Sequence, residues 1–137
     1  MSITLKKGIL IMTIGEIAKL LDCEVLCCES KLGSEVHTAC GSDMMSDVLA
    51  FVKDQAVLLT GLLNPQVVRT AEMMDIICIV FVRGKKPAED VTQLAAQKGI
   101  AILSTKSRMF EACGLLYENG LRGGESAKMS AGGSTDE

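Results

Sequence analysis

The 137-residue sequence has few aromatic residues: it contains no tryptophan, one tyrosine and three phenylalanines. Proteins that bind single-stranded nucleic acid without sequence preference stack the bases on aromatic side chains, and this chain lacks the groups for such a surface. Its formal net charge of -3 at pH 7 also provides no basic field that would attract a phosphate backbone. The sequence therefore argues against a nucleic-acid partner.

Long apolar runs are also missing. The longest ones, such as residues 76–82, have the length of a strand, whereas a membrane-spanning helix needs about 20 apolar residues. The first eleven residues contain two lysines but no small-residue cleavage site, so they do not resemble a signal peptide. We expect a cytoplasmic protein with no membrane partner, and we interpret residues 1–11 as an N-terminal extension.

Signatures of catalysis and of metal binding are scarce. His37 is the only histidine, so a histidine-based metal site or a standard catalytic triad could use that residue alone. Gly84-Lys85 lacks the upstream glycine and the following Ser/Thr of a P-loop, and no G-x-G-x-x-G follows a predicted strand. We expect a protein that is not an enzyme, with no catalytic residue, no metal and no cofactor.

Six cysteines are present, but none of them forms a C-x-x-C pair. Cys23, Cys27 and Cys28 are spaced C-x3-C-C, and on a strand the last two point to opposite faces, which hampers joint metal ligation. The absence of a secretory signal favours reduced thiols in a cytoplasm. An alternative function stays open: a redox or metal-linked accessory protein working through Cys23, Cys27, Cys28 or Cys40.

The order of predicted elements is that of an α/β domain. Thr13 and Glu16 have the form of a capping box and predict a helix up to about residue 22. Strands are predicted at residues 24–28 and 36–40, followed by a helix that ends near residue 54. Three strand-loop-helix units come next, with strands at residues 56–60, 76–82 and 101–104 and helices over about residues 65–74, 87–98 and 107–119.

This alternation predicts one α/β domain of three layers, with helices on both faces of a mostly parallel sheet. We place the domain at residues 12–121. Residues 122–137 have too little apolar surface to offset the entropy of ordering, so we predict a disordered tail there.

Ligands of parallel sheets bind where the strands end and the helices begin. The loops at these points offer hydroxyls, cations and helix-start N–H groups, which suit a small anion such as phosphate or an adenine nucleotide. The predicted ligand-binding residues are Thr60, Gly61, Asn64, Arg83, Gly84, Lys85 and Thr105. The alternative is that they are only the turn and capping residues such loops need. We interpret Asp43 and Asp47 as capping groups of the predicted helix beside them.

Residues 14–121 resemble the DRTGG domain, on the basis of SDMMSDVL (42–49), LLTG (58–61), IVFVRGKKP (79–87) and ILST (102–105). The chain departs from the pattern that gives the family its name. Leu62-Leu63 stand in place of Asp-Arg, and Val82-Arg83-Gly84 stand in place of Thr-Gly-Gly. We therefore transfer no role of the family's signature residues to these positions, and we assign none of them as catalytic.

The resemblance implies an α/β module that is commonly a homodimer and serves as a regulatory or interface domain without established chemistry. Such modules occur beside CBS domains in regulated pyrophosphatases, and stand-alone relatives resemble accessory proteins of bacterial energy or hydrogen metabolism. The sequence and the resemblance together predict a non-catalytic regulatory domain that homodimerises, with a small anionic ligand or a partner protein as further partners.

Overall fold

The computed structural model describes residues 4–6, 9–50 and 54–124, and its centre is a five-stranded sheet in the order β3-β8-β7-β6-β5. Four of its strands run parallel to one another: β5 (Thr38–Gly41), β6 (Ala56–Thr60), β7 (Ile76–Phe81) and β8 (Ala101–Ser104). Strand β3 (Glu24–Cys27) pairs with β8 in the antiparallel direction. The predicted α/β class with a mostly parallel sheet is confirmed.

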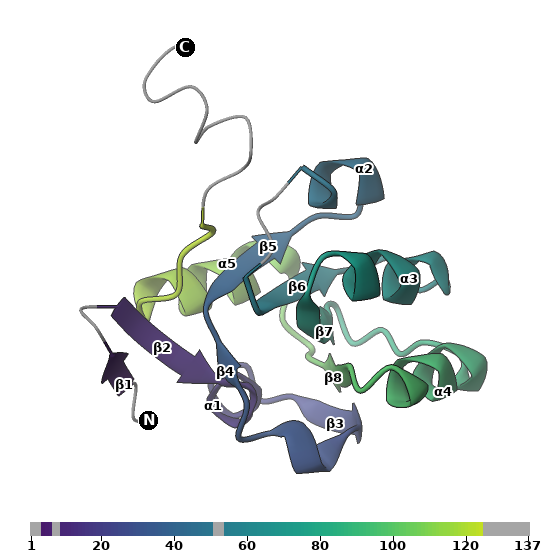
Figure 1. Ribbon diagram of the computed structural model, residues 1–137, viewed down its shortest axis with the longest axis horizontal. Coiled ribbons are helices and arrows are strands. Elements are labelled where there is room, and N and C mark those ends of the chain that lie inside the picture. The colour runs from purple at the N-terminus through teal and green to yellow at the C-terminus, as the bar shows by residue number, and fades with distance from the viewer. Residues whose placement is uncertain (1–3, 7–8, 51–53, 125–137) are drawn as a thin grey trace.

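Helices cover both faces of this sheet, as Figure 1 shows with α3 and α4 to the right of the strands and α1 to the left. Helices α1 (Ile14–Leu20) and α5 (Met109–Glu118) share a hydrophobic core with one face. Helices α3 (Gln66–Met73) and α4 (Glu89–Gln97), with the short α2 (Met45–Val48), share a second core with the other face.

Strand β6 shows why the sequences of the central strands are continuous apolar runs. All of its residues are buried, with Val57 and Leu59 in the core under α1 and α5, and Ala56 and Leu58 in the core under α3 and α4. Successive side chains of a strand point to opposite faces, so a strand covered on both sides needs apolar residues at every position. The predicted bounds of β6 and β8 agree with the structure.

The capping box at the start of α1 is present as predicted. The Glu16 N–H donates to Thr13 Oγ1 at 3.1 Å, and the Thr13 N–H donates to Glu16 Oε1 at 2.8 Å. These reciprocal bonds satisfy two donors that the first helical turn leaves unpaired.

A second, smaller sheet joins the hairpin β1 (Thr4–Lys6) and β2 (Ile9–Thr13) to β4 (Glu35–Val36). The strand predicted at residues 36–40 is therefore wrong as one element, because β4 and β5 belong to different sheets. His37 lies between them: its N–H donates to Gln55 O, and its ring Nδ1 is 2.8 Å from Asp54 Oδ1. These contacts fix His37 at the point where the chain passes from the smaller sheet to the five-stranded sheet. The polar turn after β3 includes a short 3-10 helix, Glu29–Lys31.

Two other predicted segments extend past the described residues. The helix predicted up to residue 54 is described only as α2, and residues 51–53 lie outside the described residues. Of the predicted tail, residues 122–124 are described and residues 125–137 are not. Here the Ala39 N–H donates to Arg122 O at 3.0 Å, and Thr38 and Arg122 form a parallel bridge. Among the described residues, no helix has the length and apolarity needed to cross a membrane.

Replacing Thr13 by alanine removes the acceptor that caps α1, so we expect the free energy of unfolding to fall by about 1 kcal/mol. Denaturant unfolding followed by circular dichroism measures this. Thr92→Ala, in the middle of α4, is the matched control and is expected to change stability by less than about 0.5 kcal/mol. Equal losses in both variants would contradict a specific capping role.

Candidate functional site

Three adjacent strand ends bring an acid, a hydroxyl and a guanidinium together. Asp43 follows β5, Thr60 ends β6 and Arg83 follows β7, and these strands are neighbours in the sheet. The Gly61 N–H donates to Asp43 Oδ1 at 2.7 Å, and Thr60 Oγ1 donates to the same oxygen at 2.9 Å. Thr60 is fully buried, and a buried hydroxyl needs such a partner. The loop after β5 is thereby tied to the end of β6.

The guanidinium of Arg83 lies against the backbone of Gly61. A methyl group at position 61 would come within 2.8 Å of Arg83 Nη2 and 3.6 Å of Asp43 Oδ2. The missing side chain of glycine thus provides the space in which these two charged groups approach the end of β6. Any larger residue at position 61 would have to displace the guanidinium.

Hydrogen bonds from Gly61 and Thr60, together with the nearby cations, hold Asp43 in its ionised form. The hydrogen bond from the Gly61 N–H is the largest cause that lowers the pKa of Asp43, and partial burial opposes it. The hydroxyl of Thr60 and the positive charges of Arg83 and Lys85 lower this pKa further. Hydrogen bonds and opposite charges favour a carboxylate over the neutral acid, so Asp43 carries its negative charge at neutral pH.

The loop after β7 is fixed by the loop after β8. Arg83 and Gly84 both have left-handed backbones, with φ of 64° and 70°. The Arg83 N–H donates to Ser107 O and the Gly84 N–H to Thr105 O, both at 2.8 Å, and Ser104 Oγ donates to Lys85 O at 2.8 Å. With the backbone held in this way, the side chains of Arg83 and Lys85 remain exposed.

Thr60, Gly61, Arg83 and Lys85 of the predicted set lie in this cluster, whereas Thr105 lies away from the surface. Thr105 is 2% exposed, and its hydroxyl donates to Leu21 O at 2.6 Å, which anchors the end of β8 to the end of α1. Asn64 is exposed, and its Oδ1 accepts a hydrogen bond from the Gln66 N–H at 2.9 Å. Asn64 therefore orients the start of α3.

Most backbone donors of these loops are already paired. Gly61 donates to Asp43, the Leu62 N–H donates to Thr60 Oγ1 at 3.1 Å, and Gly84 donates to Thr105 O. A ligand that approaches the edge as it stands meets the cationic side chains of Arg83 and Lys85 rather than a row of open N–H groups. The chemistry that this surface supports is anion binding through side chains.

The sequence-based interpretation of Asp43 as a helix cap is wrong. Helix α2 has Met44 at its N-cap, with no side-chain hydrogen bond, while the carboxylate of Asp43 turns toward β6. The signal that could have found this role is the strand order. Once β5 is placed beside β6, the residues directly after each strand become neighbours.

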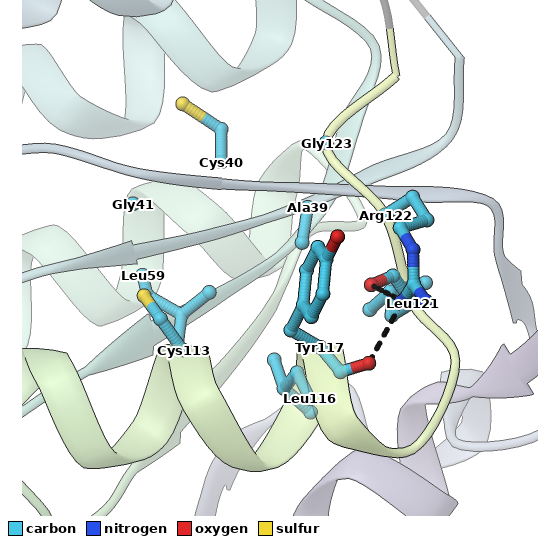
Figure 2. Close-up of a pocket in the computed structure, with 10 residues that line it drawn as sticks. All are labelled: Ala39, Cys40, Gly41, Leu59, Cys113, Leu116, Tyr117, Leu121, Arg122 and Gly123. Carbon is cyan, nitrogen blue, oxygen red and sulfur yellow. Dashed lines mark hydrogen bonds between the residues drawn. The ribbon is translucent and has the colours of Figure 1, made fainter.

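A separate cavity of about 290 Å³ lies between β5, α5 and the segment after α5. In Figure 2, Ala39 points toward the Tyr117 ring, while Cys40 points away from α5. The guanidinium carbon of Arg122 lies 3.8 Å from the centre of the Tyr117 ring, and Nη1 donates to Tyr117 O at 2.7 Å. Arg122 is one of the residues that line this mainly apolar cavity, and its guanidinium is engaged by these contacts with Tyr117.

Comparison with known proteins identifies the family. The family model described as the DRTGG domain matches residues 16–118, which is most of the chain. The chain belongs to the DRTGG domain family. A search of curated proteins found no match.

A solved structure shares the fold of this DRTGG domain. It is the crystal structure of the CBS and DRTGG domains of the regulatory region of Clostridium perfringens pyrophosphatase, complexed with the activator diadenosine tetraphosphate. The sequences are 16% identical and the TM-score is 0.60. The match covers 75% of this chain and 45% of the pyrophosphatase chain, so the DRTGG domain described here spans less than half of that chain.

The cysteines of this DRTGG domain give no support to the redox or metal-linked alternative. All six are free thiols, and the described part of the chain has no group of three or more His, Cys, Asp or Glu residues that could hold a metal ion. Burial raises the pKa of Cys23 to about 12, and those of Cys27 and Cys40 to about 11. Because the thiolate is the reactive form, these residues are poor nucleophiles near neutral pH.

Alkylation tests this directly. At pH 8, a shift of the pKa from 9.0 to about 12 lowers the thiolate fraction of Cys23 about a thousandfold, and a pKa of about 11 lowers those of Cys27 and Cys40 about a hundredfold. We expect iodoacetamide to label these cysteines slowly in the folded domain and much faster in denaturant. The labelling rates should rise as the pH rises toward the raised pKa values. Mass spectrometry of the labelled peptides measures each rate, and equal rates in both states would contradict the prediction.

Proposed function

We propose that this DRTGG domain is a non-catalytic regulatory or accessory domain that binds a small anionic ligand, phosphate or an adenine nucleotide, at the carboxyl edge of β6 and β7. The observation that carries the proposal is the guanidinium of Arg83 held over Gly61, with the exposed ammonium of Lys85 in the same loop. Arginine binds phosphate oxygens through two parallel N–H groups, and lysine adds a mobile positive charge.

Adenine nucleotides are the first ligands to test because of the fold neighbour. That structure contains the regulatory region of a pyrophosphatase with diadenosine tetraphosphate as activator. The low sequence identity supports the shared fold, and the ligand is our extension to this chain. Since Arg83 and Lys85 are exposed, we expect binding to weaken as salt screens the charges.

The chemistry of the edge supports the non-catalytic part of the proposal. Asp43 is the carboxylate that contacts the end of β6 in the described structure, and both of its hydrogen bonds there hold the loops together. Its lowered pKa makes it a weak base, because a general base works best when its pKa lies near the operating pH. Binding without turnover is the activity that this arrangement supports.

Isothermal titration of the purified domain with phosphate, ADP and ATP at low salt tests ligand binding. We expect Arg83→Ala and Lys85→Ala each to weaken binding about tenfold, since each removes a charged hydrogen-bond donor. Lys98→Ala is the matched control, because it removes a lysine that lies outside the Asp43 cluster. Lys98 is the C-cap residue of α4 and pairs with Glu72 at 3.3 Å. No heat with any of the three ligands at millimolar concentration would remove the proposal.

We further propose that the domain forms a homodimer through α5. Phe110 and Tyr117 are 84% and 60% exposed, and together with Cys113 and Gly114 they follow the i, i+3, i+4, i+7 spacing of one helix face. The same residues border a shallow hollow of about 570 Å³. A two-fold interface places a patch against its own copy, so the Phe110 ring of one copy would face the hollow beside Gly114 of the other.

Sedimentation at micromolar concentration tests this interface. We expect a dimer for the unmodified chain and a monomer for Phe110→Glu, because a buried unpaired carboxylate is costly. Met73→Glu is the control, since Met73 is 53% exposed on α3 in the opposite helical layer. A monomeric unmodified chain, or a dimer lost only in Met73→Glu, would contradict the assignment to α5.

A further inference from the structure

The end of β6 already holds an anion that belongs to the protein. The carboxylate of Asp43 accepts hydrogen bonds from the Gly61 N–H at 2.7 Å and from the Thr60 hydroxyl at 2.9 Å. A peptide N–H, a hydroxyl and a neighbouring guanidinium form the donor set that a phosphoryl group would use in the same place. A ligand that approaches Arg83 therefore meets a negative charge at the point where its own charge is best stabilised.

We infer that Asp43 is an internal competitor of the anionic ligand, and that a ligand engages the end of β6 only by displacing its carboxylate from Gly61 and Thr60. This inference rests on the anion site proposed above. It adds a residue to the site and states which ligands the site accepts. Asp43 is exposed and lies in the loop between β5 and α2, so its side chain can rotate into solvent without opening either core.

Displacement favours multiply charged phosphates over simple carboxylates. A monoanionic carboxylate would only exchange one carboxylate for another at the same donors, with no net gain in charge or in hydrogen bonds. A pyrophosphate group carries more charge and more acceptor oxygens, so it can bond to Gly61 and Thr60 and reach Arg83 and Lys85 at the same time. Asp43 thus makes the site selective for oligophosphate groups, because ligands that merely equal its own interactions are excluded.

The test compares pyrophosphate and acetate as probes of the full-length chain, with titration calorimetry for affinity and the Gly61 amide resonance as a local reporter. In the unmodified chain, we expect pyrophosphate to bind and to shift the Gly61 resonance, and acetate to do neither at the same concentration. In Asp43→Ala, we expect pyrophosphate to bind about tenfold more tightly, because the competing charge-assisted hydrogen bonds are gone. Acetate should then begin to shift the Gly61 resonance.

Two further variants separate the competitor from other effects. Asp43→Asn keeps an oxygen that can accept both hydrogen bonds but loses the charge, so we expect a smaller gain in affinity than for alanine. It also gives the direction of the effect if Asp43→Ala is unstable to heat. Asp47→Asn, on α2, removes the same charge from the neighbouring helix and is expected to leave pyrophosphate affinity within about twofold, since exposed charges are screened.

The outcomes distinguish this inference from the proposed function. If the unmodified chain binds pyrophosphate and Asp43→Ala binds it equally or more weakly, Asp43 is not a competitor, while the anion site stands. A gain of equal size in Asp47→Asn also overturns the inference, because it would then be a general effect of charge. If pyrophosphate fails to bind every variant, the anion site is wrong and the inference falls with it.

Discussion

The structure depends on one constraint: four neighbouring parallel strands are covered by helices on both faces. Side chains above and below the sheet are committed to two separate cores, so polar chemistry can gather only at the strand ends. Parallel direction then brings all carboxyl ends to one edge, where the loops after β5, β6 and β7 are held in contact. The charged cluster at Gly61 follows from this packing rather than from any local sequence motif.

The sequence predicted the interior of the fold better than its margins. Continuous apolar runs reveal strands covered on both sides, which is why β6 and β8 were predicted with their observed bounds. The edge of the sheet was harder, because polar contacts made at long range decide it. His37 divides a predicted strand through its contact with Asp54, and Asp43 finds its partners 17 and 18 residues away. The spacing of neighbouring residues in the sequence does not reveal such long-range pairs.

The departure from the family signature has a spatial counterpart. Leu62 and Leu63, which stand in place of the Asp-Arg pair, are partly buried against the core under α3 and α4. An acid and a guanidinium nevertheless reach the end of β6 from the loops on either side, as Asp43 and Arg83. The apolar pair anchors the loop while neighbouring strands supply the charges, so the chemical character of this edge is distributed over three loops.

The bridge between Arg122 and Thr38 has a consequence for solubility. An edge strand with open backbone groups invites pairing with another chain and growth into fibres. Here the chain itself occupies the start of the outer side of β5, and the contacts of Arg122 with Tyr117 hold that segment in place. At the opposite edge, β3 has an irregular register between Val25 and Cys27, and Glu24 pairs with Lys86 at 2.7 Å. The segment after α5 thus resists unwanted strand addition at the start of β5, and the irregular register makes β3 a less regular template for another strand.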